Sequence, residues 1–256
     1  MDFSKLAQII DQLNDDCFWK PIAGDEEAIK EFDKHISLIE ESQSWGRELN
    51  SKKGKVLEDF AVFLFSRFQD VNVKRNMRPG DNETDLEIRL SEKILPAFMR
   101  EHIGQIIICE CKNKKTSSID VGMVTKLAEL LPKRFSRFGV FISILGMGGY
   151  GWRYGEGKRK KIMYKERLPI ISFTVEELKE LRNGRNFYTM IKEKFYALVD
   201  EVDDESADFP EHGHVEYTKR IFEIFEHLKK CDIINEEEKK IFQQRVIERY
   251  GPIPED

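Results

Sequence analysis

Residues 105–112, Gln-Ile-Ile-Ile-Cys-Glu-Cys-Lys, are the stretch of this sequence that decides its fold. The unbroken apolar run at its start predicts a central strand that is buried on both faces. Side chains alternate across a strand, so Glu110 and Lys112 face one side while Cys109 and Cys111 face the other. A carboxylate and an ammonium group at the end of a buried strand are costly to desolvate unless they pair or bind a ligand. The end of this strand is therefore a candidate site.

The segments around this strand predict a mixed α/β fold. Residues 85–90 alternate charged and apolar side chains, as in a strand with one buried face. Apolar spacing and turn residues predict further elements: a core helix at 54–68, a helix at 121–135, strands at 138–145 and 169–173, and a helix from 174 to about 181. A capping-box pattern at Thr174 and Glu177 marks the start of that last helix. The order of helices and strands is that of a sheet flanked by helices.

Four regions are expected along the chain. They are an N-terminal helical cap (1–50), a catalytic domain (51–199), an acidic linker (200–214) and a C-terminal pair of helices (215–256). The apolar positions of the C-terminal pair are more than two isolated helices would leave in water. We expect the pair to pack on the catalytic domain, on a second copy of the chain in a homodimer, or on a partner protein.

Composition excludes several classes of protein. The 256 residues are 40% hydrophobic, enough for one substantial core. No apolar run approaches the roughly 18 residues of a membrane span, and the first residues do not resemble a signal peptide, so a soluble cytoplasmic protein without membrane contact is expected. The four cysteines include no Cys-x-x-Cys pair, which favours buried free thiols over disulfides or a zinc site.

Charge is distributed unevenly. The net charge is −5, yet residues 200–216 hold eight acids and no Lys or Arg, while residues 153–167 hold seven basic residues and two acids. Phosphate contacts depend on local charge, because charges beyond a Debye length of about 10 Å are screened. An acidic total is therefore compatible with a nucleic-acid partner.

Asp85 brings a second carboxylate to the strand that precedes Glu110 and Lys112 in the chain. Two hard oxygen ligands at one sheet edge suit Mg²⁺, which keeps water and phosphate as its other ligands. Such a metal polarises a phosphate and lowers the pKa of bound water. Lys112 would orient that water or stabilise the charge that develops at phosphorus.

These residues resemble the signature of the PD-(D/E)XK nuclease superfamily, which includes restriction endonucleases. Asp85 followed by a strand and then Glu110-Cys111-Lys112 matches the motif, and Glu58 lies in the preceding helix where such families often carry a glutamate. The resemblance covers residues 54–145 and extends to about 181. It implies a restriction-endonuclease-like fold, with a mixed central sheet flanked by helices and with helical additions at both ends.

The resemblance also implies roles for individual residues. Asp85, Glu110 and the backbone carbonyl of Cys111 would bind Mg²⁺ or Mn²⁺, and Glu58 would reach the metal through water. Glu58 would thus join Asp85, Glu110 and Lys112 as a catalytic residue. Lys126, on the following helix, would contact phosphate or assist catalysis.

Alternatives remain for several of these positions. Thr84 replaces the proline of the motif, and the interval from Asp85 to Glu110 is long because residues 91–104 insert what we expect to be a short helix. Glu83 and Glu87 are therefore rivals of Asp85. Glu110 and Lys112 could form an edge-strand salt bridge, Glu58 could be an acid favoured in a helix's first turn, and Lys126 could be a solvated lysine.

Residues 146–151 match the spacing of a dinucleotide-binding fingerprint. That fingerprint needs a helix to follow at once, and residues 152–161 contain two more glycines and no apolar stripe, so nucleotide binding is not expected. We expect a mobile loop that contacts nucleic acid through cations and aromatic rings: Trp152, Arg153, Lys158, Arg159, Lys160 and Lys161. A plain solvated surface loop is the alternative.

The sequence thus predicts a Mg²⁺-dependent endonuclease that hydrolyses DNA, with a role in prokaryotic restriction or anti-phage defence by analogy alone. One alternative is a catalytically inactive nuclease-fold module that binds nucleic acid or assembles a defence complex. Another is a nuclease that acts on RNA or on branched DNA.

Overall fold

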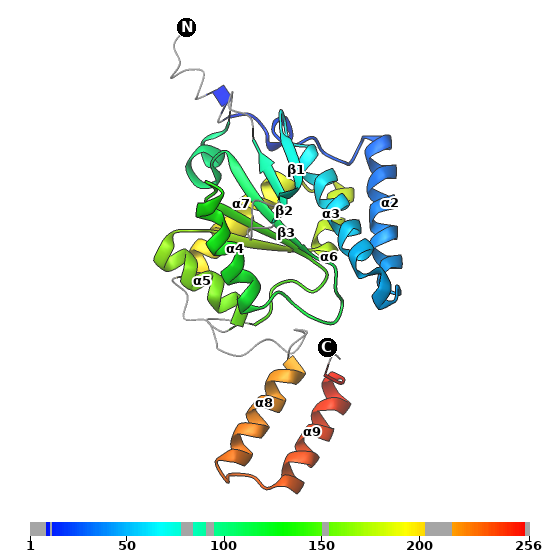
Figure 1. Ribbon diagram of the computed structural model, residues 1–256, viewed down its shortest axis with the longest axis vertical. Coiled ribbons are helices and arrows are strands. Elements are labelled where there is room, and N and C mark those ends of the chain that lie inside the picture. The colour runs from blue at the N-terminus through cyan, green and yellow to red at the C-terminus, as the bar shows by residue number, and fades with distance from the viewer. Residues whose placement is uncertain are drawn as a thin grey trace.

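The computed structural model describes residues 9–10, 12–77, 84–90, 95–149, 154–202 and 217–253. It contains a five-stranded mixed sheet with the strands in chain order (Figure 1). The strands are β1 (Asn72–Met77), β2 (Thr84–Arg89), β3 (Ile106–Lys112), β4 (Phe138–Ser143) and β5 (Ile170–Thr174). The pairs β1–β2 and β2–β3 are antiparallel, and the pairs β3–β4 and β4–β5 are parallel. The predicted mixed α/β class is confirmed.

Helices cover both faces of this sheet (Figure 1). On one face α3 (Asn50–Ser66) and α7 (Phe187–Val202) enclose the larger core, and α2 (Glu26–Ser42) packs outside α3. On the other face α4 (Val121–Lys133) and α5 (Tyr154–Glu166) enclose a smaller core. Ile107 and Cys109 belong to the larger core while Ile108 belongs to the smaller one, as alternation along a strand requires.

Short helical elements complete the sheet domain. They are 3-10 turns at Asp15–Cys17, Arg47–Leu49 and Lys179–Asn183, a π-helical turn at Met99–Ile103, and α6 (Val175–Leu178). The capping box expected at Thr174 and Glu177 is present at the start of α6. The π-helical turn lies in the insertion where a short helix was expected. The turn predicted around Pro79 lies outside the described residues.

Two elements differ from the expectation. Strand β1 was not predicted, because Asn-Val-Lys-Arg-Asn-Met has no regular alternation and forms an edge strand with few apolar side chains. Helix α7 was not predicted either, and it extends through Asp200 and Glu201, which had been assigned to the acidic linker. Residues 203–216, which include the rest of that linker, lie outside the described part of the chain.

The segment from Tyr154 to Glu166 is a helix, α5, and not the mobile loop that its glycines indicated. One of its glycines, Gly155, permits close packing. A Cβ at Gly155 would lie 2.6 Å from the carbonyl oxygen of Ile119 and 3.0 Å from that of Gly148, so no larger residue fits without movement of the backbone. Glycine here allows a helix to approach a loop closely, although it lowers intrinsic helix propensity.

The C-terminal helices α8 (Tyr217–Lys230) and α9 (Glu236–Tyr250) pair with each other below the sheet domain (Figure 1). Helix α8 also contacts the start of α5, because the Arg220 guanidinium lies 3.3 Å from the centroid of the Tyr154 ring. The Tyr154 hydroxyl donates to a Glu223 carboxylate oxygen at 2.9 Å. Exposed isoleucines remain on both helices, and a role of the pair in assembly stays a prediction.

All four cysteines are free thiols. Cys109 is buried as expected, but Cys17 and Cys231 are exposed, because they lie in the short N-terminal turn and at the end of α8. Within the described residues, no helix has the length and apolar character needed to cross a membrane.

Candidate active site

Asp85 and Glu110 meet at one end of the β2–β3 pair. The antiparallel register runs from Arg89 opposite Ile106 to Leu86 opposite Cys109. Continuing it by one residue places Asp85 opposite Glu110, in agreement with the hydrogen bond between them. Directly opposed residues of antiparallel strands project from the same face, so both carboxyl groups lie on the α4 side of the sheet. The position of these two acids therefore follows from the register.

Each acid accepts a hydrogen bond from the other strand. The Asp85 backbone N–H donates to Glu110 Oε1 at 3.3 Å, and the Cys111 backbone N–H donates to Asp85 Oδ2 at 2.8 Å. Carboxylate oxygens thus accept hydrogen bonds from backbone N–H groups where the backbone pairing of β2 and β3 ends. These reciprocal bonds fix the positions of both carboxylates at this end of the strand pair, and Glu110 is only 8% exposed.

Glu58 approaches the same region from α3, on the opposite face of the sheet. Burial and then the negative charge of Asp85 raise the pKa of the Glu58 carboxyl above its ordinary value. The charges of Asp85 and Glu58 also contribute to the raised pKa of the Cys111 thiol, after its hydrogen bond with Cys109 and burial. Glu58 and Asp85 are therefore electrostatic neighbours, with the Cys111 side chain near both.

Lys112 lies two positions beyond Glu110 on the same face of β3, about 6.6 Å along the strand. Its half-buried ammonium donates to the carbonyl of Ser118. Burial lowers the pKa of Lys112, and the Asp120 carboxylate acts in the opposite direction. The suggested Glu110–Lys112 salt bridge is replaced by a contact between Lys112 and the loop after β3.

Lys126 projects from α4 toward Glu110. Its Nζ lies 3.8 Å from Glu110 Oε2, and more than half of its side chain is exposed. This lysine is therefore both near a candidate metal ligand and accessible from solvent. Its placement matches that expected of a residue that meets an incoming phosphate, and the role itself stays a prediction.

Glu87, one of the rivals of Asp85, has a different role. Its carboxylate is 3% exposed, lies 2.6 Å from Arg89 and 3.5 Å from the buried guanidinium of Arg134, and its Cα lies opposite Ile108 in the middle of the strand. An acid that is enclosed between two arginines is structural. Glu83, the other rival, lies outside the described residues.

A Glu87→Ala variant is expected to lose about 3–5 kcal/mol of unfolding free energy, because it removes the 3% exposed carboxylate that pairs with the buried Arg134 guanidinium. Urea unfolding measures the loss. Glu129→Ala on the exposed side of α4 is the matched control and should change stability by less than about 0.5 kcal/mol. Equal stability of the two variants would show that the Glu87 pair is not structural.

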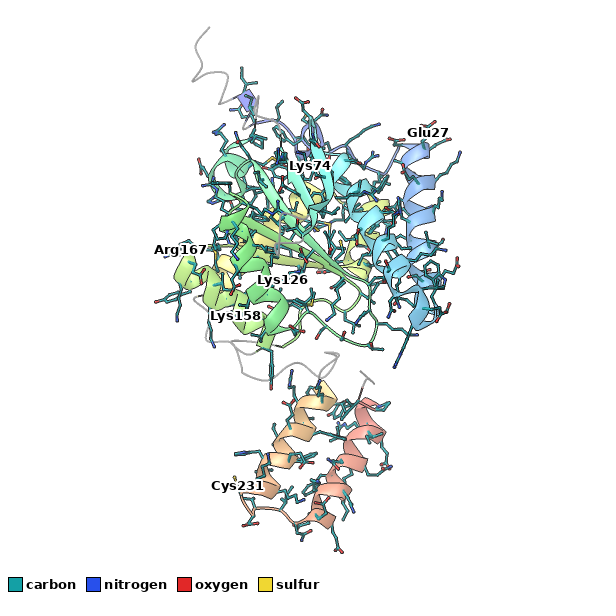
Figure 2. All side chains as sticks on the ribbon, in the orientation of Figure 1. Glu27, Lys74, Lys126, Lys158, Arg167 and Cys231 are labelled. Carbon is teal, nitrogen blue, oxygen red and sulfur yellow. The ribbon has the colours of Figure 1, made fainter. Side chains whose placement is uncertain are left out.

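The basic residues of α5 divide into two groups. Arg159 pairs with Glu156 and lies 2.7 Å from Glu201, and Lys160 is 4% exposed with its Nζ 3.7 Å from Glu201. These two cations hold α5 against α7, which corrects the expectation that they are free to contact phosphate. Lys161 is exposed and Lys158 partly so. Figure 2 shows Lys158 on α5 and Lys126 on α4, two helices that pack together.

The remaining residues of the expected basic loop, Trp152 and Arg153, lie outside the described residues. A helix does begin soon after the glycine fingerprint, contrary to the expectation. However, the Glu156 N–H in the first turn of α5 already donates to the Gly148 carbonyl at 3.0 Å. The protein itself thus satisfies an amide that would otherwise face a pyrophosphate.

Comparisons of the chain with protein-family models, with curated proteins and with solved structures gave no significant match. Any functional assignment therefore rests on the residues and geometry of this chain.

The donor set at Asp85 and Glu110 fits a hard divalent cation. Among the described residues, no three His, Cys, Asp or Glu side chains form a group that could hold a metal ion on their own. Mg²⁺ does not need such a group, since it is usually bound through one or two carboxylates together with water and substrate phosphate. Asp85 and Glu110 would supply the two carboxylates, and the carbonyl of Cys111 stays a predicted third ligand.

Proposed function

We propose that the protein is a Mg²⁺- or Mn²⁺-dependent endonuclease that hydrolyses phosphodiester bonds of DNA. The observation that carries this proposal is the pair Asp85 and Glu110, joined by reciprocal hydrogen bonds where β2 and β3 end. Lysines from β3 and from α4 lie next to that pair. A role in restriction or anti-phage defence is part of the proposal by analogy alone.

The residues divide the work of the reaction. Asp85 and Glu110 would hold the cation, which when bound polarises the scissile phosphate and lowers the pKa of a bound water. Lys112 is on the face of β3 from which it can turn from the Ser118 carbonyl toward the phosphate and stabilise the charge that develops there. Lys126 would orient the phosphate beside Glu110, and Glu58 would accept a hydrogen bond from water on the α3 side.

Cleavage should require a divalent cation, because the chain offers two carboxylates and a lysine at this place but no nucleophile of its own. Purified protein is incubated with plasmid, linear duplex DNA, single-stranded DNA and RNA, each with Mg²⁺, Mn²⁺ or EDTA. We expect cleavage of duplex DNA with either metal and none in EDTA. Undiminished cleavage in EDTA would contradict the metal mechanism.

The same assay separates the two alternatives. Cleavage restricted to RNA or to branched DNA would support the proposed site but with a different substrate. Binding of nucleic acid without cleavage under any metal condition would support the alternative of a nuclease-fold module that only binds nucleic acid.

A further inference from the structure

A second cluster of charged residues lies just beyond the candidate active site. Lys114 and Lys115 follow β3 directly and are exposed, and Lys53 lies in the first turn of α3. Helices α2 and α3 pack side by side in Figure 1, and the end of α2 and the first turn of α3 both form hydrogen bonds with Asn113 after β3. Residues more than 50 positions apart in the sequence thus form one surface.

Asn113 holds this surface together. Its side chain is 5% exposed, and its Nδ2 donates to the Lys53 carbonyl at 2.7 Å and to Ser42 Oγ at 3.1 Å. Its Oδ1 accepts from Gln43 Nε2 at 2.6 Å. A buried and fully used amide between Lys112 and Lys114 fixes the start of the loop against α3. The proximity of Lys53 to Lys114 and Lys115 is therefore built into the fold.

The three ammonium groups repel one another. Burial and then the charges of Lys115 and Lys114 lower the pKa of Lys53. Across the described ranges, no carboxylate lies within salt-bridge distance of Lys53, Lys114 or Lys115. The nearby acid Asp120 instead caps α4, where its Oδ1 accepts from the Met123 N–H at 2.9 Å. Crowded cations without an acidic partner favour a polyanion as ligand.

We propose that Lys53, Lys114 and Lys115 bind backbone phosphates of duplex DNA next to the phosphate that is cleaved. The inference rests on the proposed nuclease function for the identity of the polyanion. Lys114 and Lys115 follow Lys112 in the chain. A DNA strand whose phosphate reaches Glu110 and Lys112 would therefore also pass over the lysine cluster. Because these lysines meet phosphates and no base edge, the binding is independent of DNA sequence.

The test compares two triple variants in EDTA, where no metal-dependent cleavage can occur. One is Lys53→Ala/Lys114→Ala/Lys115→Ala, and the control is Lys30→Ala/Lys34→Ala/Lys240→Ala, which removes three exposed lysines elsewhere. Binding of a short fluorescent DNA duplex is measured by anisotropy at several salt concentrations. The logarithm of the binding constant decreases as the logarithm of the salt concentration rises. We expect this dependence to become less steep by about 0.9 per lost contact in the cluster variant and to stay unchanged in the control.

Equal slopes for the two triple variants would overturn the proposal, as would a wild-type protein that does not bind the duplex. Tighter binding of an RNA duplex of the same length would overturn the assignment to DNA. The Lys114→Ala/Lys115→Ala variant changes only exposed side chains, so it tests the cluster even if the triple variant folds poorly.

Failure of the cluster and failure of the nuclease proposal are distinguishable. If the wild type binds DNA through the cluster but never cleaves it, the binding surface is supported and the nuclease proposal fails. If the wild type cleaves DNA and the cluster variant binds DNA as the control does, the nuclease proposal is supported and the binding surface fails.

Discussion

A Glu110→Gln variant is expected to cleave DNA at least about 10²-fold to 10³-fold more slowly than the wild type, the range typical of a lost electrostatic contact in the transition state. Glutamine keeps the shape of the side chain and an oxygen that can accept from the Asp85 N–H. It removes the negative charge that would hold the cation. The rate of plasmid cleavage at saturating Mg²⁺ measures the effect.

Two controls make this result specific. Circular dichroism and urea unfolding should give wild-type values for Glu110→Gln, because the substitution is isosteric. Glu129→Gln, at an exposed position of α4, should cleave at the wild-type rate. If Glu110→Gln cleaves as fast as Glu129→Gln, Glu110 is not part of an active site.

A Lys112→Ala variant is expected to lose cleavage to a similar extent, by about 10²-fold or more, while it keeps its affinity for Mn²⁺. The lysine would act on the phosphate and would not be a metal ligand. Single-turnover rates at saturating metal isolate this step from metal binding. The substitution removes the hydrogen bond that Lys112 donates to the backbone carbonyl of Ser118. Loss of this one bond should not unfold the protein.

Lys126→Ala is the matched comparison, because Lys126 also carries a charge close to Glu110. We expect Lys126→Ala to slow cleavage by less than about tenfold, because the interaction energy of a solvent-exposed ammonium with a nearby charge is small. A strong loss in Lys126→Ala together with full activity in Lys112→Ala would assign the catalytic lysine to α4 and contradict the role given to Lys112.

The sequence was most informative where the hydrophobic pattern was strongest. The isoleucine run predicted β3 as a buried central strand, and β3 is the middle strand of the sheet. Alternation along that strand correctly separated the face of Glu110 from that of Cys109. These predictions hold because an unbroken apolar run needs burial on both faces, and because side chains alternate along a strand whatever its register.

The choice between Asp85 and Glu87 could not be made from sequence. Both acids lie on the same face of β2, because they are two residues apart. What separates them is their surroundings on β3, because Glu87 lies opposite Ile108, whereas Asp85 forms hydrogen bonds with Glu110 and Cys111. That register depends on the long connection from residue 90 to residue 105, whose path no local pattern specifies.

Helix α5 and the lysine cluster were missed for different reasons. The glycines of α5 lower helix propensity, but close packing of Gly155 on the Ile119 carbonyl overrides that preference. The cluster depends on Asn113, whose partners Lys53, Gln43 and Ser42 are 60, 70 and 71 residues away. The spacing of residues along the sequence does not predict contacts between positions so far apart.

Asp85 and Glu110 together would form a binding site for a divalent cation that serves hydrolysis. Calorimetric titration of Mn²⁺ into the wild type and into Asp85→Asn/Glu110→Gln is the direct test of this site. We expect saturable binding of Mn²⁺ to the wild type and its loss in the double variant, with both proteins folded. Equal Mn²⁺ binding by the two proteins, or none by either in the presence of DNA, would contradict it.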